Sequence, residues 1–245
     1  MAGEEVCVGG EVQSIGIAEA RSALSWWLEA GVDTAIQEEP RNWLKPAPRR
    51  ADQPAAPAPQ ANVIEPSQET LAELQQWLAT SVQLPLAGPA AKRVLPHGSE
   101  HAPIMLLSDS PAIEDAAAGR PIGGEAWALA ERMLAVIGMT ADEAYSASLS
   151  CFHSPGARMS AAEREECATI AKRHIALVKP KRLLLFGDGP SQALLGKPVV
   201  QARGHAHKIE GVRTVATFHP RSLINQPSKK SMAWQDLLLL MEDES

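Results

Sequence analysis

The stretch PIMLLSDSPAIEDAAAGRPIGG, residues 103–124, joins a short apolar run to a tail of carboxylates and glycines. The run PIMLL at 103–107 is typical of a strand that is buried on both faces of a parallel sheet. In open α/β sheets, ligands bind at the carboxyl ends of the strands. The stretch therefore predicts a central strand and, directly after it, one side of a binding site.

Three further runs resemble strands, namely YSASLS at 145–150, LLLF at 183–186 and VRTVATF at 212–218. Amphipathic helical patterns lie between them at 125–137 and 161–178, with a shorter one at 191–195. One more helix opens the region after residue 67, and a last one spans 229–241. Strands that alternate with helices predict an α/β fold with three layers, αβα, around a central four-stranded, mostly parallel sheet.

Composition divides the chain into three parts. An amphipathic helix is predicted at 17–30, within an N-terminal segment of residues 1–45. Six prolines among alanines and polar residues make 46–66 a linker. Residues 67–245 form the domain that can enclose a core. Because the N-terminal segment is too short for a core of its own, it either docks back onto the domain or binds a protein partner.

The chain has 245 residues, 45% hydrophobic and 21% charged, which is typical of a globular protein. It lacks a run of about 18 apolar residues, which argues against a membrane span, and the acidic start MAGEEVCVGG does not resemble a secretory signal. We therefore expect a cytoplasmic protein.

The net charge is −6, yet residues 179–232 carry +8. That part could bind a polyanion such as DNA, although a solvated basic face fits the charges equally well.

Asp109 and Asp115 follow the first predicted strand, and His219 follows the last one. Because the carboxyl ends of parallel strands meet at one edge of a sheet, we expect these three residues to converge. A carboxylate that orients water, facing a histidine that stabilises a departing anion, can hydrolyse a bond to a good leaving group. The same spacing is also compatible with a helix cap and a His-Pro turn.

Two motifs resemble those of the family 4 uracil-DNA glycosylases. SDSPAIEDAAAGRPIGG at 108–124 is similar to the family's first active-site motif, and FHPRSLINQPSKKSMAWQDL at 218–237 is similar to its second. The spacing of Cys151 and Cys167 also matches, in the same order along the chain. The resemblance implies the αβα fold of that family and an enzyme of DNA repair, which flips a deaminated base out of DNA and hydrolyses its N-glycosidic bond.

The resemblance also assigns roles by position. Asp109 and Asp115 match water-associated glutamates, each one methylene shorter, and His219 matches the histidine that stabilises the uracil anion. The implied base pocket consists of Ser110, Pro111, Ile122, Ala147 and Ser148, and the implied DNA contacts are Arg203, Arg221, Ser222, Lys229 and Lys230.

Several of these positions differ from the family pattern. Ile122 replaces the aromatic ring that stacks on the base. Ala147, or Ser148 in a shifted register, replaces the asparagine that reads uracil. The alternative is therefore a member that keeps the fold and a DNA-binding face without turnover.

The family normally holds an iron–sulfur cluster on four cysteines. Cys151 and Cys167 stand at two of these places, whereas Ser81 and Leu84 stand at the other two. Neither serine nor leucine supplies a thiolate. We therefore expect no cluster and no other metal site, and we expect Cys151 and Cys167 to be ordinary buried thiols.

Overall fold

The computed structural model describes residues 17–29 and 68–242, which fall into two units, Met1–Ala58 and Pro59–Ser245. In the first unit, α1 (Ile17–Glu29) is the helix that the sequence pattern predicts. Its Trp26 and Trp27 side chains are exposed. The predicted linker at 46–66 lies outside the described residues. Across the two described ranges, every helix is too short or too polar to cross a membrane.

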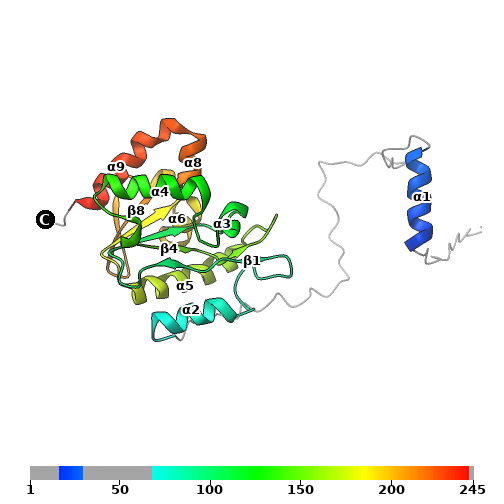
Figure 1. Ribbon diagram of the computed structural model, residues 1–245, viewed down its shortest axis with the longest axis horizontal. Coiled ribbons are helices and arrows are strands. Elements are labelled where there is room, and N and C mark those ends of the chain that lie inside the picture. Colours follow the sequence, from blue (N-terminus) through cyan, green and yellow to red (C-terminus); the bar gives the residue numbers. More distant parts are fainter. Residues whose placement is uncertain (1–16, 30–67, 243–245) are drawn as a thin grey trace, which may run out of the picture. The chain divides into compact units, whose positions relative to one another are not determined.

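The second unit is built on a six-stranded sheet with the order β2-β4-β3-β6-β8-β7 (Figure 1). Its four central strands are parallel and correspond to the four predicted ones: β4 (Ala144–Ser148), β3 (Ile104–Ser108), β6 (Arg182–Phe186) and β8 (Val212–Thr217). Two antiparallel edge strands, β2 (His97–Gly98) and β7 (Ala206–Ile209), extend this predicted core. A separate antiparallel pair joins β1 (Lys92–Arg93) to β5 (Phe152–His153).

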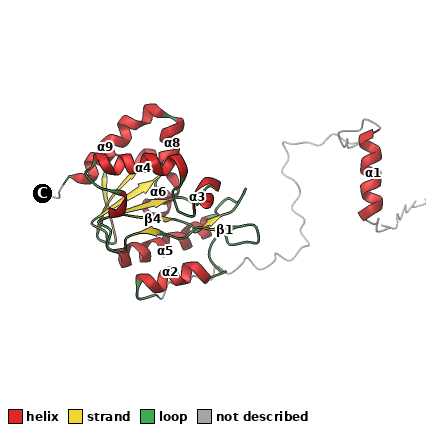
Figure 2. Ribbon diagram, in the orientation of Figure 1, coloured by secondary structure: helices red, strands yellow, loops and turns green. Residues whose placement is uncertain are grey.

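Helices cover both faces of the sheet, which gives the three layers that the sequence predicts (Figure 2). One face carries α4 (Gly124–Val136), α8 (Pro220–Asn225) and α9 (Lys230–Met241), and the other carries α2 (Leu71–Thr80) and α5 (Ala161–Val178). The shorter helices are α3 (Ile113–Ala118), α6 (Asp188–Leu195) and α7 (Val199–Ala202), and single 3-10 turns lie at Ala141–Glu143 and Pro227–Lys229.

The core lies on both sides of β3, whose five residues are all buried because helices cover both of its faces. Local signals fix where the surrounding helices begin. The side chain of Ser160 accepts a hydrogen bond from Glu163 N, and Glu163 accepts one from Ser160 N, so α5 starts at the capping box that the sequence indicates. This frame holds the carboxyl ends of the parallel strands at one edge of the sheet.

A buried polar chain ties β4 to the helices beneath it. The Gln75 amide donates to the Tyr145 hydroxyl at 3.2 Å, and that hydroxyl lies 2.8 Å from Nε2 of His174. Burial lowers the pKa of His174 to about 4, so its ring is neutral at pH 7. Its Nε2 can then accept a hydrogen bond from the Tyr145 hydroxyl. The buried Tyr145 and His174 are thereby paired in the core, and the half-buried Gln75 bonds to them from its edge.

Candidate active site

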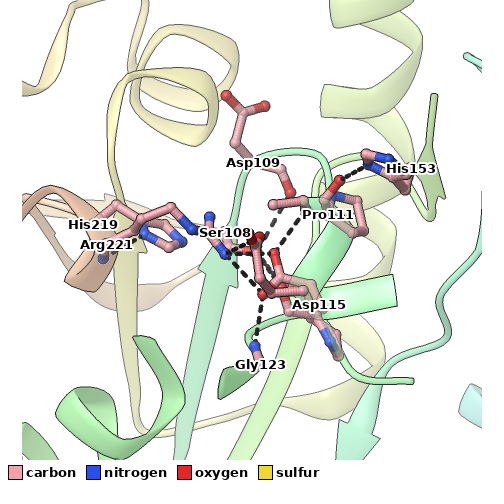
Figure 3. A network of polar contacts seen from close by, with 12 residues as sticks. Ser108, Asp109, Pro111, Asp115, Gly123, His153, His219 and Arg221 are labelled. Atoms are coloured by element: carbon pink, nitrogen blue, oxygen red, sulfur yellow. Dashed lines mark hydrogen bonds and ion pairs between the residues drawn. The ribbon is translucent and has the colours of Figure 1, made fainter. Parts of the chain in front are cut away.

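Four loops meet at the carboxyl ends of the parallel strands. Leu149 N donates to Ser108 O at 2.9 Å, which joins the loops after β3 and β4. Gly187 N donates to Thr217 O at 2.8 Å, which joins the loops after β6 and β8. Figure 3 shows the polar network at this edge. Asp115 and His219 are brought together here through Arg221, whereas Asp109, the third residue of the predicted convergence, points away from both.

His219 follows β8 and is the N-cap of α8. Its Nδ1 accepts a hydrogen bond from the backbone N–H of Arg221 at 3.0 Å. Burial, helped by the Arg221 cation and opposed by the Asp115 carboxylate, lowers the pKa of the imidazole to about 4. Because Nδ1 is an acceptor, the neutral ring carries its proton on Nε2. His219 is thus an uncharged hydrogen-bond donor at pH 7.

Asp115 is buried and its carboxylate is fully bonded. Oδ2 accepts from Ala112 N and Oδ1 accepts from Gly123 N, each at 2.7 Å. Nη2 of Arg221 donates to both oxygens, at 2.9 and 3.0 Å (Figure 3). A carboxylate offers about four acceptor sites, so these bonds leave none for water. This geometry corrects the predicted water-associated role of Asp115, because the residue instead fastens the first-motif loop to α8.

Asp109 is exposed, and its side chain points away from Asp115 and His219 (Figure 3). Its Oδ1 accepts a hydrogen bond from Ser110 N at 2.8 Å. The carboxylate lies against Gly189 in the first turn of α6, where a Cβ atom would overlap with it. The positive end of a helix favours such a carboxylate. Gly189 therefore makes room for Asp109 in a position where the second oxygen, Oδ2, stays available.

Asp109 lines a pocket of about 550 Å³ together with Ser110 and Pro111. Pockets of this size accommodate small ligands. The other wall residues include His153, Arg158, Arg164, Asp188 and Gln192, several of which come from the loop after β5 and the start of α5. Nδ1 of His153 donates to the Pro111 carbonyl at 2.8 Å, since a carbonyl can only accept. His153 thereby holds the first-motif loop in place.

The predicted base pocket is only partly present. Ser110 and Pro111 line the pocket, but Ile122 and Ala147 are 0% exposed and belong to the core. The prediction for these two residues is corrected, because the strand and loop that carry them turn their side chains inward. Ser148 lies at the end of β4, with its hydroxyl buried and without a hydrogen-bond partner among the described residues.

Two of the five residues predicted to contact DNA form ion pairs within the domain. Arg203 donates to both oxygens of the buried Asp236, at 3.1 and 3.0 Å, and to the Met232 carbonyl. Arg221 is bonded to Asp115. The predicted DNA contacts of both arginines stay a prediction, and each guanidinium is engaged with an aspartate in this structure. The other three lie near the second motif: Ser222 and Lys230 are exposed, and Lys229 lies over the Phe218 ring at 4.7 Å.

The residues at the cluster positions do not fit an iron–sulfur cluster. Leu84, Cys151 and Cys167 line one small, mostly apolar cavity of about 20 Å³, which is room for about one water molecule. Burial raises the pKa of Cys151 to about 11 and that of Cys167 to about 12, so both are thiols at pH 7. Within the described residues, no group of three His, Cys, Asp or Glu side chains could hold a metal ion.

Comparison with known proteins gives the family. The model of the uracil DNA glycosylase superfamily matches residues 95–238, which is more than half of the chain. The chain belongs to the uracil DNA glycosylase superfamily. It is 23% identical to a type-4 uracil-DNA glycosylase of Archaeoglobus fulgidus over 141 residues, covering 53% of this chain and 71% of the relative. It is 22% identical to the type-4 uracil-DNA glycosylase of Pyrobaculum aerophilum over 180 residues, covering 69% of this chain and 92% of the relative.

The chain is thus a divergent, family-4-like member of the superfamily. Reasoning from the sequence missed three groups at the site. His153 and Gly189 carry no signal of their own, because their roles depend on Pro111 and Asp109 in the loop after β3. Arg164 is recognised only by its place in the pocket wall. His153 lies two residues after Cys151, which matches a cysteine of the family pattern. This position is the sequence feature that comes nearest to indicating a role for His153.

Proposed function

We propose that this member of the superfamily is a DNA glycosylase that flips a deaminated base out of DNA and hydrolyses its N-glycosidic bond. The observation that carries the proposal is the uncharged His219, whose Nε2–H is a donor at pH 7. When the bond between C1′ and the base breaks, its electron pair moves onto the base. A donor that is already fixed in place stabilises this developing charge in the transition state.

Asp109 is the carboxylate that we propose for orienting water, because its Oδ2 is available whereas Asp115 is fully bonded. A water molecule adds to C1′ of the sugar, and Asp109 accepts its proton. The products are an abasic site and the anion of the base, which becomes the free base by taking a proton from solvent while Asp109 releases its own to solvent. Asp115 is a positioning residue in this scheme, since it acts through the first-motif loop and through Arg221.

A weak or altered base preference follows from the pocket. Strong discrimination between bases requires hydrogen-bonding groups that read the base edge. Ala147 offers no such group and is buried, and Ile122 offers no exposed ring for stacking. We therefore propose that the enzyme excises more than one deaminated base, with no iron–sulfur cluster taking part.

A catalytically degenerate, DNA-binding protein is the second candidate. The full engagement of Asp115 and the burial of Ile122 and Ala147 favour it. In that case the N-terminal segment, with Trp26 and Trp27 exposed on α1, would bind a protein partner and supply the function.

Single-turnover assays separate the two candidates. Oligonucleotides that contain uracil, hypoxanthine or xanthine are incubated with the protein in excess, and abasic sites are then cleaved by alkali. Excess protein prevents slow product release from hiding the chemistry. We expect product from the wild type and from His101→Ala, an exposed histidine away from the site. His219→Ala should be slower by at least about a hundredfold. Salt-dependent DNA binding with no product from any substrate would instead establish the second candidate.

A further inference from the structure

Two arginines beside the site are free of internal partners. Arg158 and Arg164 both line the 550 Å³ pocket that contains Asp109. In the described parts of the chain, neither guanidinium has a hydrogen bond or an ion pair. Arg203 and Arg221, which the sequence favours as DNA contacts, are by contrast each bonded to a buried aspartate. The wall formed by residues 158–164 therefore carries positive charge that has no partner among the described residues.

Within the described residues, the acidic groups of the same pocket form no ion pair with the two arginines. Oδ1 of Asp109 accepts from Ser110 N, and Oδ1 of Asp188 accepts from Val199 N at 2.7 Å. Glu163, the neighbour of Arg164, has its Oε2 bonded to Ser160 N. Each of these carboxylates is held by a backbone N–H, so the guanidiniums remain available for an external anion.

We propose that Arg158 and Arg164 bind a phosphodiester of the DNA strand whose target nucleotide enters the pocket beside Asp109. The planar guanidinium matches the oxygens of a phosphate and can donate two parallel hydrogen bonds to it. Lys229 ends the 3-10 turn that precedes α9, and Lys230 is the first residue of α9. The choice of DNA as the ligand rests on the proposed function. Binding of a phosphate at this site does not require that the protein excise a base.

DNA binding by the full chain tests the proposal. Fluorescence anisotropy is measured with a short fluorescein-labelled duplex and with its single strand, each containing one uracil, over a series of salt concentrations. Arg158→Gln and Arg164→Gln are compared with Lys172→Gln, which removes an exposed cation outside the pocket from α5, the helix that also carries Arg164. Thermal unfolding of each variant shows that the fold is intact.

We expect each arginine variant to bind duplex about tenfold more weakly. The slope of log K against log salt should fall by about 0.9 for each phosphate that the variant no longer neutralises in duplex, or by about 0.7 in single strands. Lys172→Gln should keep the wild-type slope. Folded arginine variants with unchanged affinity and slope would overturn the proposal. If the wild type excises no base but the slopes still fall, the proposed activity fails and the phosphate site stands.

Discussion

Replacing Asp115 by Asn tests the clamp between the two motifs, because the change keeps the shape of the side chain and removes its charge. The amide has one acceptor oxygen, so its nitrogen must face either a backbone N–H or the Arg221 guanidinium. Breaking a fully buried ion pair costs about 3–5 kcal/mol. Arg221 is 36% exposed and can turn toward water, which reduces the cost, so we expect a loss of about 3 kcal/mol in the free energy of unfolding.

Urea unfolding measures this loss. With a typical m-value of about 2 kcal/mol per molar urea, the midpoint should fall by about 1.5 M at unchanged m. Glu114→Gln is the matched control, since Glu114 is the adjacent carboxylate, is 62% exposed and lies 3.9 Å from Arg221. It should change stability by less than about 0.5 kcal/mol. Equal midpoints for Asp115→Asn and Glu114→Gln would refute the clamp.

Three further predictions use the same folded chain. Because His174 and His219 have pKa values of about 4 in the folded state against about 6.5 when unfolded, the unfolded chain binds more protons in this range. Urea unfolding should therefore show stability falling as pH drops from about 6.5 to about 4, with a smaller fall in His174→Gln, and a flat profile would contradict this. Arg203→Gln should lower the free energy of unfolding by about 2 kcal/mol in urea, because it leaves Asp236 buried without its cation. The dependence of DNA affinity on salt should not change in this variant. The thiols of Cys151 and Cys167 should react with a thiol reagent only after denaturation, and the chain purified without oxygen should contain no iron, whereas stoichiometric iron would contradict the fit of these residues.

The central part of the fold is predictable from local patterns. The runs at 103–107, 183–186 and 212–218 predict three of the parallel strands, because strands covered on both faces need apolar residues. The run at 145–150 predicts the fourth, β4, although it is mostly polar. The edge strand β2 has two residues and carries no such pattern. α6 begins at Asp188, three residues before the predicted start, since Gly187 with φ 87° makes the turn and the Asp188 carboxylate bonds to Val199 N. These features depend on tertiary contacts.

The site is less predictable than the fold. The motifs place His219 correctly, because its position at the end of β8 is local information. The aspartates that pair with Arg203 and Arg221 lie 33 and 106 residues away in the sequence. The sequence alone therefore predicts a basic surface from these arginines, because only the fold shows the aspartates beside them. Likewise, the burial of Ile122 depends on how the first-motif loop packs against the core.

The proposed chemistry depends on the protonation state and tautomer of the His219 ring, which NMR of the ¹⁵N-labelled imidazole in the full chain measures. We predict a neutral ring with the proton on Nε2 and a bare, hydrogen-bonded Nδ1, unchanged from about pH 8 to about pH 5. His219→Ala identifies the signal by its loss. A ring that is cationic at neutral pH, that titrates near 6.5 or that carries its proton on Nδ1 would contradict the account.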